Sequence, residues 1–396
     1  MRLSAIALWD GDQYRGTSTL TWSGDRIEAV EPVDGGPEPE LCVIPGLVDT
    51  HVHLVGHAGE GTADFATWPL VTTRDEQVLH GVAHAQRAMR GGVTTLRDLA
   101  ADDAQVAIRR VFDAGILPGP RVLAHGMVGM TAGHNDLFVP PAFPLRKPVA
   151  DGPDECRKLV RTWARAGMDG IKIATSGGVL SIGDRNGWRN QTPAEVEATV
   201  DEARALGMRV AAHAHSRAGI QAALDAGVDS IEHATLMSIE QAEAIAARGV
   251  TVGPTLLINE AIAAGSVPVT AQAMEKAAEL VAARDELFAA AARAGVRFVL
   301  GTDANGHHVR FGDQMREVGR MTQVLGLDAA AALRSATSLA ARSIGLGDRV
   351  GTLAVGMGVD FLVLRGRPWE RIGDLRLENL VAVVSRGRVV SGDLPR

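Results

Sequence analysis

The chain has 396 residues, 46% of them hydrophobic and 22% charged, with a formal net charge of −7. This composition is typical of a globular protein with a large core, and the lack of a basic block argues against nucleic acid or an anionic membrane as a partner. The two cysteines, Cys42 and Cys156, lie in no CxxC motif, so we expect no disulfide framework and a cytoplasmic location. We expect no signal peptide or transmembrane span.

Residues 1 to about 44 are predicted to form short strands and turns. Polar and apolar residues alternate over 18–22 and over 26–30, and the turn Ser23-Gly24-Asp25 separates these two segments. The Gly35-Gly36-Pro37 sequence then interrupts the pattern.

A different rhythm runs from about residue 45 to 344. Helical segments end in glycine, and an apolar β segment follows directly, as at Ala166-Gly167 and Ala226-Gly227. Capping boxes at Thr192 and Ser238 mark two helix starts. The β segments are eight, near residues 46–53, 93–99, 121–126, 170–175, 209–215, 230–233, 250–256 and 297–303. Eight alternating β/α units predict a (β/α)8 TIM barrel, an α/β fold; an open doubly wound sheet is the alternative.

After about Gly345 the short strands return, over 360–364 and 380–385. Each flank is too short to be stable alone. We therefore predict that residues 1–44 and 345–396 together form a small β-sandwich domain beside a barrel of residues 45–344.

Polar residues follow several of the barrel strands. His51 and His53 are spaced i, i+2, so both would face the same side of the first strand. Other strands end in a larger set of such residues: Lys172, His213, His233 and Asp303. Catalytic groups of a barrel gather at the carboxyl ends of its strands, and imidazoles with a carboxylate suit Zn²⁺ or a similar ion. A free lysine ammonium would repel a cation, so Lys172 fits only as a carbamate.

This pattern resembles the binuclear type of the amidohydrolase superfamily, over nearly the whole chain. The closer likeness is to the branch with prolidase-like, imidazolonepropionase-related and ochratoxin-hydrolysing enzymes. The segments that carry it are 171–181, 210–215, 229–233 and 301–303. The resemblance implies two divalent metal ions, with zinc expected, bound by His51, His53, Lys172, His213, His233 and Asp303. It also implies a CO2-derived carbamate on Lys172, a bridging hydroxide and a homo-oligomer.

The expected reaction is hydrolysis of an amide C–N bond in a small molecule, an N-acyl amino acid or a dipeptide such as X-Pro. The bridging hydroxide would attack, and Asp303 would serve as the proton shuttle to the leaving nitrogen. His134 resembles a substrate-contacting histidine of the prolidase-like branch. His215, on the same strand face as His213, is expected to contact substrate as well.

Two alternatives remain at this point. A mononuclear deaminase, or a hydrolase of cyclic amidines or imidazolones, would usually have a glutamate soon after the fifth-strand histidine and no bridging lysine; here Ala214, His215 and Ser216 follow His213, and Lys172 is present. A non-enzymatic assembly protein would have lost its ligands, but each ligand position is filled. His80 and His84, spaced i, i+4 without the glutamate of HExxH, are expected on the surface.

Overall fold

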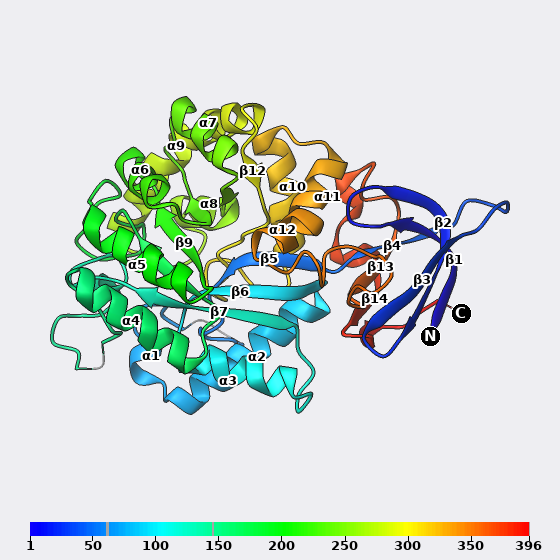
Figure 1. The fold of residues 1–396 in the computed structure, drawn as a ribbon, viewed down its shortest axis with the longest axis horizontal. Helices are drawn as coiled ribbons and strands as arrows, with labels where there is room; N and C mark the ends of the chain where they lie inside the picture. The colour runs from blue at the N-terminus through cyan, green and yellow to red at the C-terminus, as the bar shows by residue number, and fades with distance from the viewer. Residues whose placement is uncertain (61–62, 145, 396) are drawn as a thin grey trace.

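The computed structural model describes residues 1–60, 63–144 and 146–395. Its centre is an eight-stranded sheet in which neighbouring strands are parallel and follow one another in chain order (Figure 1). The strands are β5 (Leu47–Val52), β6 (Val93–Ala101), β7 (Arg121–Val128), β8 (Gly170–Ala174), β9 (Arg209–Ala214), β10 (Ser230–His233), β11 (Thr251–Gly253) and β12 (Arg297–Phe298).

The sheet curls until the segment after β12 meets β5. Thr50 N donates to Leu300 O and His53 N donates to Ala304 O, each over 2.8 Å. The strand order also lacks the reversal of a doubly wound sheet. The α/β fold with a TIM-like barrel is therefore confirmed, and the doubly wound alternative is wrong.

Helices connect the barrel strands and cover their outer side. They are α1 (Trp68–Val71), α2 (Arg74–Arg90), α3 (Asp103–Asp113), α4 (Pro153–Ala166), α5 (Pro193–Ala205), α6 (Arg217–Ala226), α7 (Ile239–Arg248), α8 (Leu256–Ala263), α9 (Ala271–Arg293), α10 (Gln314–Leu325), α11 (Ala329–Ala336) and α12 (Ser338–Ser343). The capping boxes expected at Thr192 and Ser238 are present, and Gly167 and Gly227 end their helices in the left-handed conformation. None of the described helices combines the length and the apolar character needed to cross a membrane.

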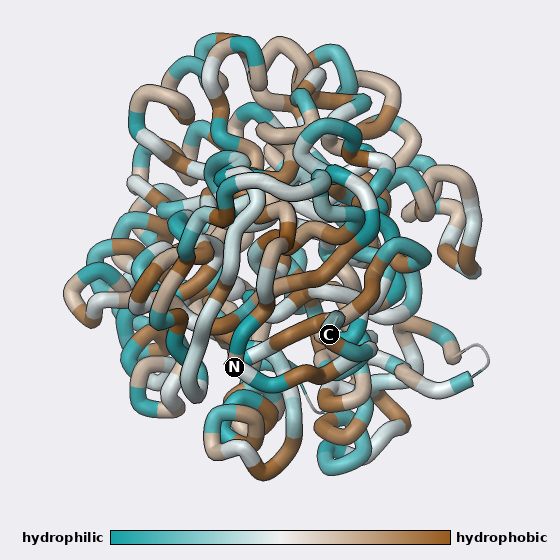
Figure 2. The backbone as a smooth tube through the Cα atoms, turned by 90° about the vertical axis from the view of Figure 1, so that its right-hand side faces the viewer, coloured by the Kyte–Doolittle hydropathy of each residue, from teal (hydrophilic) through white to brown (hydrophobic). Residues whose placement is uncertain are grey.

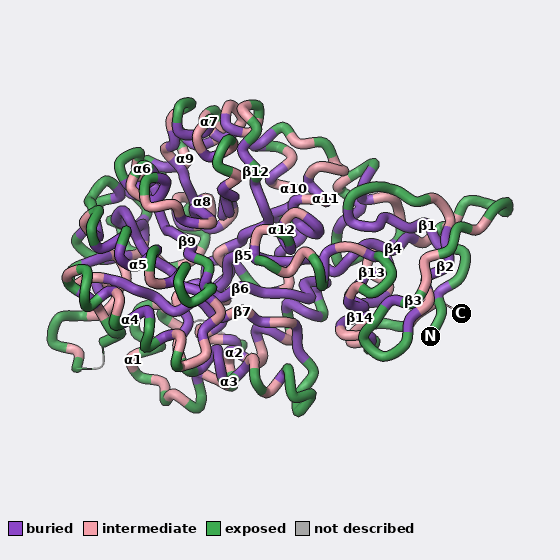
Figure 3. The backbone as a smooth tube through the Cα atoms, viewed as in Figure 1, coloured by how far each residue is buried: buried purple, intermediate pink, exposed green. Residues whose placement is uncertain are grey.

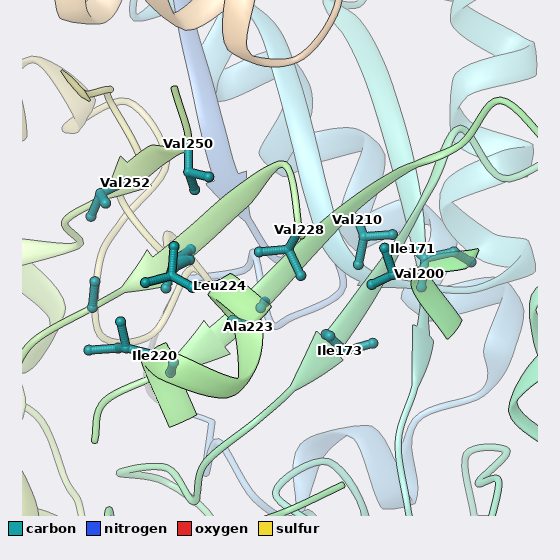
Figure 4. Packing of buried hydrophobic residues seen from close by; sticks show 14 of the residues in the cluster. Ile171, Ile173, Val200, Val210, Ile220, Ala223, Leu224, Val228, Val250 and Val252 are labelled. Carbon is teal, nitrogen blue, oxygen red and sulfur yellow. The ribbon is translucent and has the colours of Figure 1, made fainter. Parts of the chain in front are cut away.

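The barrel core lies between strands and helices. Ile220 and Leu224 of α6 belong to the same buried cluster as the strand residues Val210 and Val252 (Figure 4), and all four are at most 2% exposed. Burying one such side chain contributes about 1.5–3 kcal/mol, so this packing fixes the strands that carry the site. Figure 3 shows buried backbone through the centre of the barrel and exposed turns around it.

The two ends of the chain meet in a second sheet of seven strands. Its members are β1 (Arg2–Trp9), β2 (Tyr14–Ser23), β3 (Arg26–Pro32), β4 (Leu41–Pro45), β13 (Phe361–Arg365), β14 (Leu380–Ser385) and β15 (Arg388–Gly392). Their order is β15-β14-β13-β4-β1-β2-β3, so β4 lies between β13 and β1. Blue and orange-red strands are neighbours in Figure 1, and Figure 2 shows the two termini on the same face.

A sheet shared by both termini is thus confirmed. The expected sandwich is not confirmed, because these seven strands hydrogen-bond within a single sheet. Arg396, the last residue of the expected terminal domain, lies outside the described residues. Gly46 alone separates β4 from β5, and a Cβ at Gly46 would come within 2.2 Å of Thr94 Oγ1, so glycine permits the close passage from sheet to barrel.

Candidate metal centre

The two histidines at the end of β5 lie next to Asp303, which comes from the segment after β12. His51 Nε2 is 3.6 Å and His53 Nε2 is 3.0 Å from the same oxygen, Asp303 Oδ1. The backbone fixes this approach, because Asp303 N donates to His51 O over 2.8 Å. The i, i+2 spacing therefore presents both rings to one carboxylate.

Three further imidazoles lie beside this group. His213 belongs to β9, His215 follows the end of β9, and His233 ends β10. His213, His215 and His233 are each at most 5% exposed, and one nitrogen of each ring lies within 4.8 Å of the other two. His51, His233 and Asp303 meet the same distance limit, so His233 belongs to both groups. The five imidazoles and the carboxylate form one continuous cluster.

Oxygen atoms of the protein orient the rings of this second group. His213 Nε2 is 3.1 Å from a backbone carbonyl oxygen of the loop after β8. The Nδ1 atoms of His215 and His233 lie 2.9 Å from Thr235 Oγ1 and 2.7 Å from Thr255 Oγ1. Metal-binding histidines commonly contact such an oxygen through one ring nitrogen, and the remaining ring nitrogen is then free to bind the ion.

Two residues of the cluster have left-handed backbones although neither is glycine. The φ angle is +68° at His233 and +56° at Asp303. Such conformations cost on the order of 1–3 kcal/mol each and are concentrated at functional sites. At His233 the turn breaks the strand alternation, so that Glu232 and His233 both reach the residues around His51.

Lys172 of β8 lines the same cavity. It is 4% exposed, and its Nζ has no hydrogen-bond partner among the described residues. Burial lowers the pKa of Lys172 to about 8, although the negative charges of Glu232 and Asp303 act in the opposite direction. An unpartnered buried amine is costly, and conversion to a carbamate would replace it with two oxygen donors.

The protonation states of the cluster also suit a cation. Burial lowers the pKa of His51 to about 4 and that of His215 to about 3, so both rings are neutral near pH 7. Burial acts to raise the pKa of Asp303, but the adjacent histidines and Lys172 bring it down to about 2. Neutral imidazoles and an ionised carboxylate are the forms that ligate zinc-like ions, so these residues fit a divalent metal.

A buried ion pair adjoins His51. Arg97 Nη2 donates to Glu232 Oε1 over 2.7 Å, and the two residues are at most 1% exposed. Burial would raise the pKa of Glu232, but the Arg97 guanidinium and then His51 hold it well below its usual range. The other carboxylate oxygen, Glu232 Oε2, lies 3.1 Å from His51 Nδ1.

His134 stands against the cluster from the loop after β7. Its ring stacks on that of His213, with centroids 4.2 Å apart. His134 Nδ1 is 3.0 Å from Ser181 Oγ, which donates over 2.7 Å to Asp184 Oδ2, and Lys276 Nζ donates over 2.7 Å to Asp184 Oδ1. This chain of contacts connects α9 to the loop after β8 and to His134.

The cluster opens into a cavity of about 720 Å³. Aromatic and aliphatic side chains form much of its described wall, among them Phe65, Phe138, Phe143, Leu180, Ile258 and Ile262. The cationic side chains Arg74 and Arg146 also line it, and each is paired with aspartate. A mostly apolar chamber with polar groups gathered at one place is the usual form of a small-molecule site.

All eight residues singled out from the sequence line this one cavity. They are His51, His53, His134, Lys172, His213, His215, His233 and Asp303. No pattern in the sequence selects Arg97, Asp184 or Lys276, and Ser181 and Glu232 occur only within segments 171–181 and 229–233, which carry the family resemblance. The expectation that His84 lies on the surface is wrong: it is 0% exposed, with its ring 4.6 Å from that of Phe311.

Several known proteins are similar to this chain over most of its length. A family model described as "Amidohydrolase family" matches residues 42–392. The ochratoxinase of Aspergillus niger is 30% identical over 368 residues, which span 87% of this chain and 74% of that protein. The imidazolonepropionase of Deinococcus radiodurans is 25% identical over 400 residues, covering 92% and 88% of the two chains.

Solved structures show the same likeness. The crystal structure of a Xaa-Pro dipeptidase with methionine bound in its active site superimposes with a TM-score of 0.87. It is 30% identical in sequence, and the alignment covers 98% of both chains. The likeness therefore extends over the barrel and the sheet of the two termini.

Proposed function

Since the chain belongs to the amidohydrolase family and is a metal-dependent hydrolase, we propose that it cleaves the amide C–N bond of an N-acyl amino acid or a dipeptide, X-Pro dipeptides included. The observation that carries this proposal is the convergence of two donor groups and an unpartnered lysine on one cavity. Relatives named as an ochratoxinase and a Xaa-Pro dipeptidase support amides as the substrate class.

In this proposal two divalent ions, expected to be zinc, would be held by side chains from five parts of the barrel. His51, His53 and Asp303 would hold one ion, and His213 and His233 the other. Lys172, as a carbamate, would contribute an oxygen to each. Bound divalent cations of this kind lower the pKa of a water molecule and polarise a carbonyl.

The chain's own residues supply the proton transfer. Asp303 is ionised near neutral pH, so it can accept a proton from the attacking water. It would then pass the proton to the leaving nitrogen, which must be protonated because an amide anion is a very poor leaving group. The hydrogen bond from backbone N of Asp303 to His51 O holds the carboxylate in place for this step.

The substrate would occupy the apolar chamber with its amide at the cluster. His134 is held by Ser181 through Nδ1, which makes Nε2 the nitrogen available to a substrate group. We propose that His134 and His215, which both line the cavity, contact the substrate. The aromatic side chains Phe65, Phe138 and Phe143 would surround the acyl group or the leaving amine.

The competing reactions are deamination and the opening of a cyclic imidazolone. The experiment below includes them because one relative is an imidazolonepropionase. Among the described residues that line the cavity there is no glutamate, whereas Lys172 is one of them. Both facts favour amide hydrolysis.

The test is hydrolysis of a mixed panel by metal-loaded and chelator-stripped protein. The panel holds X-Pro and other dipeptides, N-acyl amino acids, lactones and amino-heterocycles, with each product identified by mass spectrometry. We expect metal-dependent release of a free amino acid. Release of ammonia from a heterocycle would establish the competing reaction instead.

A matched pair of variants separates ligands from other cavity histidines. His53→Asn should abolish most activity and lower the metal content, because His53 is 3.0 Å from Asp303. His57→Asn changes another histidine of the cavity wall, one that the proposal assigns to neither ion, and this variant should keep both properties. Equal losses in the two variants would contradict the ligand assignment.

Three further proposals accompany this function. The two domains would comprise residues 1–44 with 345–396, and residues 45–344. The resemblance to the family supports a homo-oligomer. The cysteine usage supports a cytoplasmic location.

A further inference from the structure

The pair formed by Arg97 and Glu232 connects three barrel strands. Arg97 of β6 donates to Thr50 O of β5 over 2.6 Å, and to Ser230 Oγ and Glu232 Oε1 of β10 over 3.2 and 2.7 Å. Ser230 Oγ also donates to Glu232 Oε1 over 2.7 Å. One oxygen of the carboxylate is thus fully engaged, and the buried guanidinium compensates its charge.

The other carboxylate oxygen is directed at His51. Glu232 Oε2 and His51 Nδ1 lie 3.1 Å apart, and neither has another partner among the described residues. A Cβ at Gly253 would come within 2.6 Å of Glu232 Oε2, so the glycine provides the space that this oxygen occupies. A carboxylate only accepts hydrogen bonds, so the proton between the two atoms belongs to His51 Nδ1.

We propose that Arg97 and Glu232 are positioning residues for His51. Arg97 keeps Glu232 in place and charged, and Glu232 fixes the His51 tautomer in which Nε2 carries the lone pair that faces His53 and Asp303. This inference rests on the proposed function, since it assumes a cation at that position.

His51 differs in this respect from the other rings of the cluster. His213, His215 and His233 have uncharged oxygens, a carbonyl and two hydroxyls, at their second nitrogens. Only the His51 ring, among the described imidazoles of the cluster, has an ionised carboxylate at its second nitrogen. A carboxylate in this place makes the ligand more basic and commonly changes metal affinity 10- to 100-fold. Loss of the Glu232 charge should therefore weaken the binding of one ion and leave the binding of the other unchanged.

The test compares Glu232→Gln with Ser230→Ala. The first variant keeps the shape of the side chain and removes its charge. The second removes a hydroxyl from Glu232 Oε1 but leaves Oε2 beside His51, so it serves as the matched control. Metal content after dialysis, the Kd of each ion by competition with a coloured chelator, and the absorption spectrum of the cobalt-substituted protein are the readouts.

We expect the Glu232→Gln protein to bind one of its two ions about 10- to 100-fold more weakly, with an altered cobalt spectrum. Ser230→Ala should stay within about twofold of the wild type. If Glu232→Gln binds both ions as the wild type does, the positioning role is refuted while the proposed function stands. A wild-type protein that binds no divalent ion would refute the proposed function and this inference together.

A purely structural role for the pair is tested by the double variant Arg97→Met with Glu232→Gln. No buried charge is left uncompensated there, so the metal-free protein should recover thermal stability relative to Arg97→Met alone. The metal affinity should stay low, because the carboxylate at His51 is still missing. Recovery of wild-type affinity in the double variant would overturn the proposal, and this variant also serves if Glu232→Gln alone does not fold.

Discussion

Lys172 should take up CO2 far more readily than an exposed lysine. Its pKa of about 8 means that about one molecule in four carries the neutral amine at pH 7.5. For an ordinary lysine, with a pKa of about 10.4, the neutral fraction at that pH is about one in a thousand. Since only the neutral amine attacks CO2, the lowered pKa gives Lys172 a roughly 200-fold larger reactive fraction than an ordinary lysine.

The assay follows carbamate formation on metal-free protein with ¹³C-labelled bicarbonate, by NMR, at constant dissolved CO2. The neutral fraction of an amine with a pKa of about 8 grows about eightfold from pH 6.5 to 7.5 and about threefold from 7.5 to 8.5. The initial rate of uptake should follow these two steps. Metal uptake should accelerate in parallel, because the carbamate supplies donor oxygens.

Two controls decide the interpretation. Lys172→Gln should give no carbamate signal, and Lys276, a second buried lysine, should stay unlabelled because it is paired with Asp184. An uptake rate that continues to rise about tenfold per pH unit up to pH 9.5 would mean that the pKa of Lys172 is that of an ordinary lysine. A signal that persists in Lys172→Gln would refute the reasoning outright.

Three other outcomes are expected. Ser181→Ala removes the hydroxyl between His134 and Asp184. KM should rise about fivefold, which corresponds to the loss of one hydrogen bond, and the metal content should not change. Steady-state kinetics and metal analysis measure the two quantities. Removing with a chelator a metal whose free concentration is 100 times its Kd should lower Tm by about 3 °C in a thermal scan, and an unchanged Tm would contradict a metal bound by the folded state. Burial raises the pKa of Glu317 from 4.5 to about 8, so the folded protein keeps a proton that the unfolded chain loses, and stability should fall as pH rises from about 4.5 to 8. Urea unfolding at several pH values should show a slope of up to about 1.4 kcal/mol per pH unit from this group, which Glu317→Gln should remove.

Much of the fold could be predicted because its determinants are local. Glycine after a helix and a capping box such as Thr192 with Glu195 act within a few residues, and the structure contains both. The order of the terminal sheet is different. The position of β4 between β1 and β13 depends on pairing between residues more than 300 apart, for which the sequence carries no local pattern.

The site divides in the same way. Residues at strand ends, such as His51 and Asp303, were predicted because parallel barrel strands bring their carboxyl ends together. Arg97 and Glu232 lie within strands, and their partnership depends on side chains that meet across the barrel interior. His84 was misplaced because distant segments cover its helix, including Phe311.

The sheet made from both chain ends has a consequence for biosynthesis. Strands β1 to β4 leave the ribosome roughly 300 residues before β13, which at about 5–20 residues per second is a delay of roughly 15 to 60 s. During that time β4 has an open edge where β13 will later pair, and an open edge invites pairing with other chains. A messenger truncated before residue 361 would leave that edge open permanently, so the shortened polypeptide should be a substrate for chaperones and proteases even with its whole barrel made.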